Sequence, residues 1–234
     1  MYIKPKKYLV ALALCLLIVE IFFYARIQSK PEKFDSVVLI ASIGCKSAPT
    51  HTVGTVIGDG LVLTVAHGVA GQTTTFITTA SGQVLNAKVA AIDVNLDLAL
   101  LYIEQTELTK DLVPLKFADA VAGTNAYFVA YQDSSQVVRA AKIKRRLVIN
   151  TQDIYLKSDV SRPSIEVETR VVVGNSGGPL INHKDEIVGL VWATSRSEKN
   201  LAWATRIEAV DKLLAMISAG DPQSATPQVV ACSG

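Results

Sequence analysis

Three short strings, far apart along the 234-residue chain, contain residue types that together can perform nucleophilic catalysis. They are Thr-Val-Ala-His ending at His67, Leu-Asp-Leu-Ala-Leu around Asp97, and Gly-Asn-Ser-Gly-Gly-Pro around Ser176. A serine hydroxyl is a poor nucleophile until an imidazole takes its proton, and the imidazole needs a carboxylate to hold its tautomer. The three strings supply one residue of each kind.

The glycines around Ser176 are part of the same chemistry. Gly174, Gly177 and Gly178 allow a tight backbone turn, so that N–H groups can point at the oxyanion of a tetrahedral intermediate. Larger side chains would obstruct that turn.

The order His67, Asp97, Ser176, with these flanking strings, resembles the trypsin-like serine proteases. The sequence is most similar to bacterial HtrA/Deg-like peptidase domains, over about residues 36–217. The segment 202–205, Ala-Trp-Ala-Thr, resembles the closing segment of that group. The resemblance implies an all-β fold of two six-stranded antiparallel β-barrels with a C-terminal helix, and an active site in the cleft between the barrels.

Carried over to this sequence, the resemblance makes Ser176 the nucleophile, His67 the general base and then acid, and Asp97 the orienting carboxylate. Gly174 and Ser176 would donate the oxyanion-hole N–H groups. Asp93, four positions before Asp97, is the alternative carboxylate in a shifted alignment. The leucines that flank Asp97 favour Asp97.

Two departures from the animal digestive enzymes point to the bacterial type. Gly68 follows His67 where those enzymes have a disulfide cysteine, and Asn175 replaces the aspartate before the serine. In zymogen-activated relatives that aspartate pairs with a newly cut N-terminus. Activation by N-terminal cleavage is therefore not expected, and no PDZ domain is expected after the helix.

The resemblance also locates a substrate pocket, built from the residues before Ser176 and from a strand over residues 191–194. Its candidate residues are Arg170, Val171, Val191, Trp192 and Ala193. Arg170 occupies the position where trypsin has an acidic residue, so its charge would repel basic side chains. Alternatively Arg170 points to solvent and leaves a small apolar pocket. Both alternatives favour apolar residues at the position before the cleaved bond.

The N-terminus has the pattern of a membrane segment. Lys4, Lys6 and Lys7 precede an apolar run over residues 8–24, which is interrupted only by Glu20. At about 1.5 Å per residue the run covers most of a hydrocarbon layer of roughly 30 Å. A cleaved signal peptide is the alternative, but the run lacks a small-x-small cleavage site. We expect an uncleaved transmembrane helix, with the rest of the chain extracytoplasmic, either periplasmic or at the cell surface.

Three cysteines fit that location. Cys15 lies within the apolar run, and Leu14 before it argues against a lipoprotein signal. Cys45 and Cys232 flank the domain, and an exported domain permits a disulfide between them. Two unpaired thiols are the alternative.

Short runs rich in Val, Ile and Thr, separated by turn signals, predict the strands. The runs cover residues 36–43, 61–65, 73–79, 125–131, 136–143, 164–168 and 186–194. Near the end, Ile207, Val210, Leu214 and Ile217 predict a helix, with Thr205 and Glu208 as a capping box. We expect an anchor and linker over 1–33, a protease domain over 34–218 with lobes near 34–115 and 120–205, and a tail over 219–234.

Composition excludes other classes. Half of the residues are hydrophobic, 19% are charged and the formal net charge is +2, so neither disorder nor nucleic-acid binding is indicated. His51 and His183 are expected at the surface, and no metal or cofactor is expected. The predicted function is a membrane-anchored serine endopeptidase acting on proteins or peptides. A proteolytically silent binding or sensing module on the same fold is the alternative, while the residue order argues against an α/β-hydrolase esterase.

Overall fold

Short Val-, Leu- and Thr-rich segments form most of the strands, and in several of them buried residues alternate with more exposed ones. In the strand Val37–Ile43, for example, Val38 and Ile40 are buried in the core of the first barrel. Such period-two burial is expected for strands that pack one face on a core. The computed structural model describes residues 14–16, 33–58, 60–104, 112–217 and 230–233.

The first group of strands closes into a six-stranded barrel, in the order β1-β2-β3-β6-β5-β4. Neighbouring strands in the barrel are antiparallel. The strands are β1 (Val37–Ile43), β2 (Thr50–Gly58), β3 (Leu61–Thr64), β4 (Thr74–Thr78), β5 (Val84–Asp93) and β6 (Leu98–Ile103). The predicted first barrel is confirmed.

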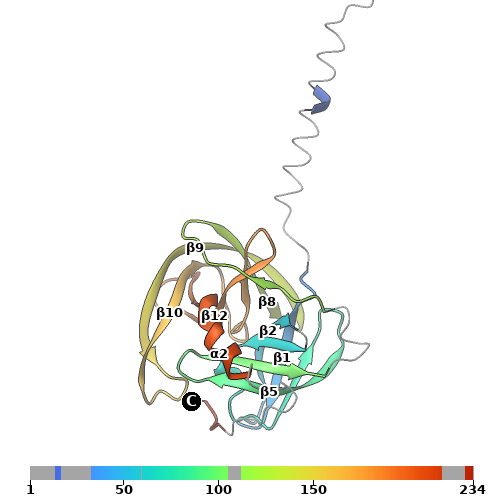
Figure 1. Cartoon of the computed structure of the whole chain (residues 1–234), viewed down its shortest axis with the longest axis vertical. Coiled ribbons are helices and arrows are strands. Elements are labelled where there is room, and N and C mark those ends of the chain that lie inside the picture. The colour runs from blue at the N-terminus through green and yellow to red at the C-terminus, as the bar shows by residue number, and fades with distance from the viewer. Residues whose placement is uncertain (1–13, 17–32, 59, 105–111, 218–229, 234) are drawn as a thin grey trace, which may run out of the picture. The chain divides into compact units, whose positions relative to one another are not determined.

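The second group forms a seven-stranded sheet, in the order β11-β8-β9-β10-β13-β12-β7. Its strands are β7 (Lys116–Phe117), β8 (Asn125–Gln132), β9 (Ser135–Gln152), β10 (Asp159–Glu168), β11 (Pro179–Ile181), β12 (Glu186–Thr194) and β13 (Leu201–Arg206). Strand β11 also pairs with β12, which brings the sheet back on itself. Figure 1 shows β8, β9, β10 and β12 of this sheet beside β1, β2 and β5 of the barrel.

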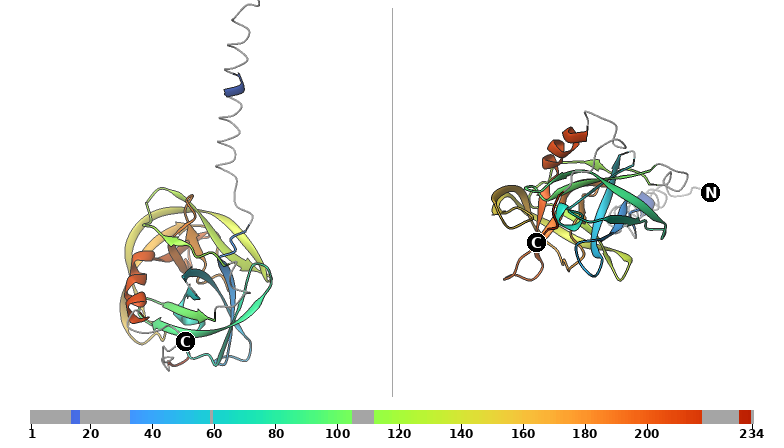
Figure 2. Two further views of the ribbon diagram at one scale, coloured as in Figure 1. Left: turned by 45° about the vertical axis from the view of Figure 1, so that its right-hand side comes forward. Right: turned by 90° about the horizontal axis from the view of Figure 1, so that it is seen from below.

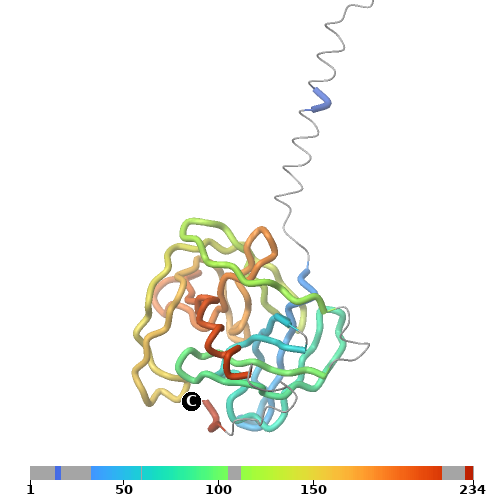
Figure 3. Tube along the Cα trace, viewed as in Figure 1, coloured from blue at the N-terminus to red at the C-terminus, as the bar shows by residue number. Residues whose placement is uncertain are grey.

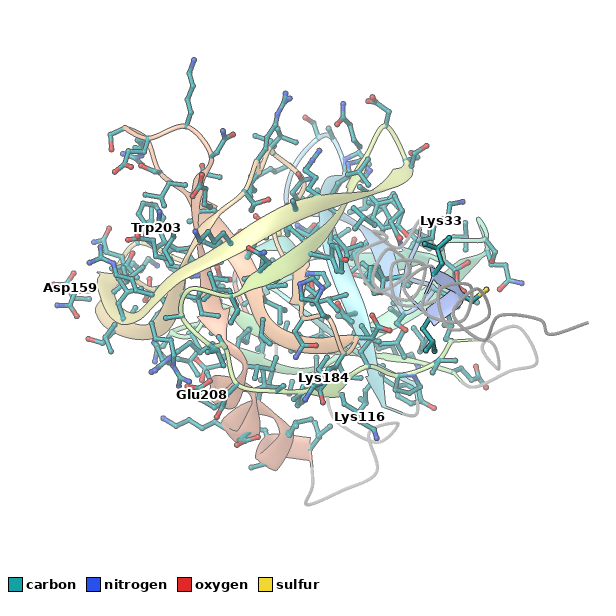
Figure 4. The ribbon with its side chains drawn as sticks, turned by 90° about the horizontal axis from the view of Figure 1, so that it is seen from above. Lys33, Lys116, Asp159, Lys184, Trp203 and Glu208 are labelled. Atoms are coloured by element: carbon teal, nitrogen blue, oxygen red, sulfur yellow. A yellow bond between two sulfur atoms is a disulfide. The ribbon has the colours of Figure 1, made fainter. Side chains whose placement is uncertain are left out.

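Of the predicted second barrel, the six strands β8 to β13 are present, and β7 is a seventh strand that the prediction did not include. It pairs in parallel with β12, with Lys116 opposite Glu186. Figure 4 accordingly shows Lys116 close to Lys184, in the turn before β12. The segment that contains β7 was predicted only as a connection between lobes, since two residues are too few for a period-two pattern.

The helical segment at the end starts later than the sequence predicts. Thr205 lies in β13, so it does not cap a helix, and the 3-10 turn η3 (Ile207–Ala209) precedes α2 (Val210–Ile217). No side chain caps η3; Glu208 instead pairs with Arg146 and Arg206. The helix α2 lies on the outside of the strands in both views of Figure 2.

The predicted membrane segment over residues 8–24 lies outside the described residues, apart from the helical residues 14–16. Among the residues that the structure describes, no helix has the length and apolar character needed to span a membrane.

Candidate active site

His67 and Asp97 lie side by side in the first barrel. His67 belongs to the 3-10 turn η1 (Ala66–Gly68), which directly follows β3. Its Nδ1 is 2.8 Å from Asp97 Oδ2, and its backbone N–H donates to Asp97 Oδ1 at 2.9 Å. Asp97 is only 3% exposed. The carboxylate therefore fixes both the ring and the backbone of His67 and leaves Nε2 for a nucleophile.

The backbone at Asp97 explains why an acidic residue can stand there. Asp97 lies in the turn between β5 and β6 with φ +57°, in the left-handed region that Asp and Asn tolerate best among residues other than glycine. Asp93 has a different role, because its Oδ1 accepts from the N–H groups of Asn95 and Leu96 and holds the same turn. The structure thus brings Asp97, and not Asp93, against His67.

Ser176 lies on the loop between β10 and β11 and is held from both groups of strands. Its carbonyl accepts from Val53 N–H on β2 at 2.8 Å, while the N–H of Gly177 donates to Val191 on β12 at 2.7 Å. Gly177 has φ +83°, and a Cβ there would lie 2.1 Å from the Val53 carbonyl oxygen. Glycine is required at this position by both its φ angle and its contact with β2.

The backbone around Ser176 offers two unused donors. The N–H groups of Asn175 and Gly177 bond to Val172 and Val191. Within the described part of the chain, the N–H groups of Gly174 and Ser176 donate to no protein acceptor. Two free N–H groups beside a serine hydroxyl are what an oxyanion hole needs.

A family model for the trypsin-like peptidase domain matches residues 52–190. The chain belongs to the trypsin-like peptidase family. Serine protease Rv3671c of Mycobacterium tuberculosis is 28% identical over 193 residues, 80% of this chain and 47% of that protein. Putative serine protease HhoB of Synechocystis is 29% identical over 167 residues, 66% of this chain and 37% of that protein. The chain thus spans less than half the length of these curated relatives.

Solved structures agree with the family assignment. The active form of the Rv3671c protease matches with a TM-score of 0.75 and 26% identity over 86% of each chain. Its inactive form matches with a TM-score of 0.66, also at 26% identity, over 79% of this chain and 89% of that one. The HtrA-type protease AlgW, at 19% identity and a TM-score of 0.66, shares the fold. The predicted resemblance to HtrA/Deg-like peptidase domains is confirmed.

Asn175 anchors the loop that precedes Ser176. It is 0% exposed, and its Nδ2 donates to the Tyr131 carbonyl at 2.7 Å. Its Oδ1 accepts from Arg139 Nη1 at 2.9 Å and from Val172 N–H at 3.2 Å. Arg139 Nη1 also reaches the Arg170 carbonyl at 3.2 Å. Arg139 on β9 therefore contacts both ends of the loop, and no motif in the sequence identifies it.

Replacing Arg139 by Met should lower kcat/KM by about 10-fold or more, because a buried amide loses a charge-assisted hydrogen bond of about 1.5–3 kcal/mol. Kinetics on a peptide substrate measure the effect, and Lys142→Met, an exposed change on the same strand, serves as control. Kinetics of Arg139→Met within twofold of wild type would refute the anchoring role.

The predicted pocket residues lie in different surroundings. Arg170 is exposed and lines a pocket of about 410 Å³ with His51, Tyr131 and the loop residues 172–174. Val171 packs against the core, Val191 is buried within it, and the half-buried Trp192 stacks on Arg162. Half-buried Ala193 follows on β12 and does not line the 410 Å³ pocket. Arg170 thus lies on the solvent side of the loop, and His51 is exposed as predicted.

The C-terminal residues 230–233 return to the turn that carries His67. Cys232 forms a disulfide with Cys45, which confirms the predicted pair. Ser233 Oγ donates to the His67 carbonyl at 2.8 Å. Gly71, with φ +70°, lies so close to the tail that a Cβ would be 2.5 Å from Cys232 N. Figure 3 shows this red end of the chain beside the blue and teal loops of the first barrel.

Removing the disulfide should lower the free energy of unfolding by about 2–5 kcal/mol, because the bond closes a loop with a sequence separation of 187. Denaturant unfolding of Cys45→Ser, Cys232→Ser and the double variant measures this loss. The double variant should lose no more than either single one, and Cys15→Ser should match wild type. Equal stability of all four variants and wild type would contradict the prediction.

Proposed function

We propose that the chain is a membrane-anchored serine endopeptidase that cleaves extracytoplasmic proteins through an acyl-enzyme on Ser176. The observation that carries the proposal is the contact of 2.8 Å between His67 Nδ1 and the buried carboxylate of Asp97. It leaves His67 Nε2 free to take the Ser176 proton and later to protonate the leaving amine. The N–H groups of Gly174 and Ser176 would stabilise the oxyanion.

Family membership and the named relatives support this chemistry. The curated relatives include a probable periplasmic serine endoprotease, DegP-like, of Halomonas elongata, which is 28% identical over 158 residues, 64% of this chain and 31% of that protein. The disulfide between Cys45 and Cys232 also favours an oxidising compartment. We therefore place the protease domain, residues 34–218, outside the cytoplasm.

The remaining segments complete the proposed organisation. Residues 8–24 would serve as the membrane span within an anchor and linker over 1–33, and residues 219–234 form the tail. The division of the chain into Met1–Glu32 and Lys33–Gly234 supports the first boundary. The lysines before the apolar run favour a cytoplasmic N-terminus.

A cleavage profile on a peptide library tests the proposed substrate class. We expect cleavage after apolar residues, because Val172 and Val173 expose apolar surface on the loop before Ser176 and Arg170 adds a positive charge. A profile dominated by cleavage after Lys or Arg would overturn this preference. No cleavage of any peptide by the folded chain would count against the endopeptidase.

The pH dependence of kcat/KM should follow His67. Burial lowers the pKa of His67, but the charge of Asp97 and its hydrogen bond raise it more, so the pKa lies above the ordinary value of 6.5. The general base must be neutral, so kcat/KM should fall about tenfold per pH unit below that pKa. Initial rates between about pH 5 and pH 9 measure the profile; an acidic limb centred below 6.5 would contradict it.

The silent binding or sensing module remains the second candidate because of one specific observation. Among the described residues, no hydrogen bond joins Ser176 Oγ to His67. Such bonds in serine enzymes often form only with bound substrate, so the arrangement is compatible with activity. Covalent labelling of Ser176 separates the two candidates.

A further inference from the structure

A buried cation lies behind the triad carboxylate. Arg162 on β10 is 3% exposed, although arginine is almost never buried without partners. Its Nε donates to the Asn95 carbonyl at 2.7 Å, and its Nη2 donates to the Gln152 carbonyl at 2.9 Å. The third nitrogen, Nη1, is 3.8 Å from Asp97 Oδ2, the oxygen that contacts His67.

The two carbonyl contacts connect different parts of the fold. Asn95 belongs to the turn between β5 and β6 that presents Asp97, whereas Gln152 ends β9 of the seven-stranded sheet. Arg162 therefore fixes the turn of Asp97 relative to that sheet. A guanidinium suits this position because its donors diverge in one plane, so it can hold two carbonyls and face a carboxylate at once.

The face of the guanidinium contacts the strand that supports the nucleophile loop. The centroid of the Trp192 ring lies 4.7 Å from Arg162 Cζ, within the range of a cation–π contact. Trp192 follows Val191 on β12, and Val191 forms two backbone hydrogen bonds, one with Gly177 and one with Gly178. Arg162 thus lies between the acid that orients His67 and the strand that holds the Ser176 loop.

Charged side chains of both signs act on His67 and on Arg162. Asp97 faces His67 from the turn before β6, Arg162 faces it from β10 and Lys46 from the segment after β1. Asp97 raises the pKa of His67, whereas Arg162 and Lys46 lower it. Around Arg162 itself, Asp97, Asp153 and Asp93 favour its charged form, while burial opposes that form. The cation therefore moderates the effect of Asp97 on the imidazole.

We propose that Arg162 is a positioning residue of the triad, which holds the Asp97 turn against the second sheet and links it through Trp192 to the nucleophile loop. This inference rests on the proposed endopeptidase function. It predicts that the charge and the shape of Arg162 act separately. The charge opposes the effect of Asp97 and so lowers the pKa of His67, whereas the planar fork sets the geometry.

Three variants of the full chain separate these effects. Arg162→Met removes both charge and fork, Arg162→Lys keeps only the charge, and Arg145→Met is a matched control, because Arg145 is an exposed arginine paired with Glu166. NMR follows the titration of His67; the chain has 3 histidines, so His51→Gln and His183→Gln assign the signals. Kinetics on a peptide substrate give kcat and KM, and thermal unfolding checks the fold.

For Arg162→Met we expect the pKa of His67 and the acidic limb of kcat/KM to rise together by about half a pH unit or more. We also expect kcat/KM at the optimum to fall about 10- to 100-fold. In Arg162→Lys the pKa of His67 should stay close to that of wild type, but kcat/KM should fall about 10-fold. Arg145→Met should change neither quantity.

A folded Arg162→Met variant with wild-type titration and kcat/KM within twofold would overturn the proposal. If that variant does not fold, Arg162→Lys decides by its kcat/KM, and a value within twofold of wild type overturns the proposal. If wild type itself proves inactive, the proposed function fails, whereas the NMR titration of Arg162→Met still tests the effect of Arg162 on His67.

Discussion

Replacing Ser176 by Ala should lower kcat by about 10⁴- to 10⁶-fold and leave KM within a few fold of wild type. The hydroxyl is the atom that would form the acyl-enzyme, and no other group in the loop replaces it. In serine proteases, loss of the nucleophile alone costs about as much as loss of the whole triad. The residual rate reflects substrate binding and the oxyanion donors, which the change leaves intact.

The Ser176→Ala variant should also keep the stability of wild type. The backbone contacts of the loop, from Ser176 to Val53 and from Gly177 to Val191, involve no side chain of Ser176. Ser161→Ala, on the exposed face of β10, is a control for serine removal as such. A Ser176→Ala variant that cleaves peptides at more than about a hundredth of the wild-type rate would rule out the proposed nucleophile.

Replacing Asp97 by Asn should lower kcat by about 10⁴-fold while the fold is kept. Asn has the same shape and tolerates the φ of +57° at this position. Its amide, however, can present a donor to His67 Nδ1, which favours the wrong tautomer and leaves Nε2 protonated. Steady-state kinetics at the pH optimum, with a thermal melt of each variant, measure the effect.

Asp93→Asn is the matched control, because Asp93 stands at the start of the same turn and its Oδ1 accepts from the N–H groups of Asn95 and Leu96 and not from His67. We expect its kcat within a few fold of wild type. The Asp97→Asn variant should in addition shift the residual acidic limb to lower pH, since Asp97 raises the pKa of His67. A large loss in Asp93→Asn together with near-normal kinetics in Asp97→Asn would assign the carboxylate to Asp93 instead.

The sequence predicts the residues of the candidate site better than the residues that hold them in place. His67, Asp97 and Ser176 stand in strings whose residue types follow from the chemistry, and the structure brings His67 and Asp97 into contact. The need for glycines beside Ser176 could be predicted for the same reason, because the chemistry requires a tight turn there. Gly177 is needed for its φ of +83°, and its close contact with Val53 adds a packing reason that only the fold reveals.

The residues that hold the site in place do not stand in a recognisable sequence motif. An arginine in a strand usually marks a solvent-facing position. Arg139 nevertheless bonds to the buried Asn175, and Arg162 lies beside Asp97. Strand β9 extends to Gln152 although charged residues interrupt its apolar pattern after Ile143. Thr205 and Glu208 match a capping box by spacing, but pairing of β13 with β12 keeps Thr205 in a strand. In each case the structure is decided by contacts with residues far away in the sequence, which a local pattern does not show.

The central claim is that Ser176 is an activated nucleophile. Labelling of the purified, folded full chain with a fluorophosphonate probe tests it most directly, with the modified residue located by peptide mass spectrometry. We predict one probe per chain on Ser176, no labelling of Ser176→Ala, and strongly reduced labelling of Asp97→Asn. Absence of labelling in the folded wild type, or labelling that persists in Ser176→Ala, would contradict the account.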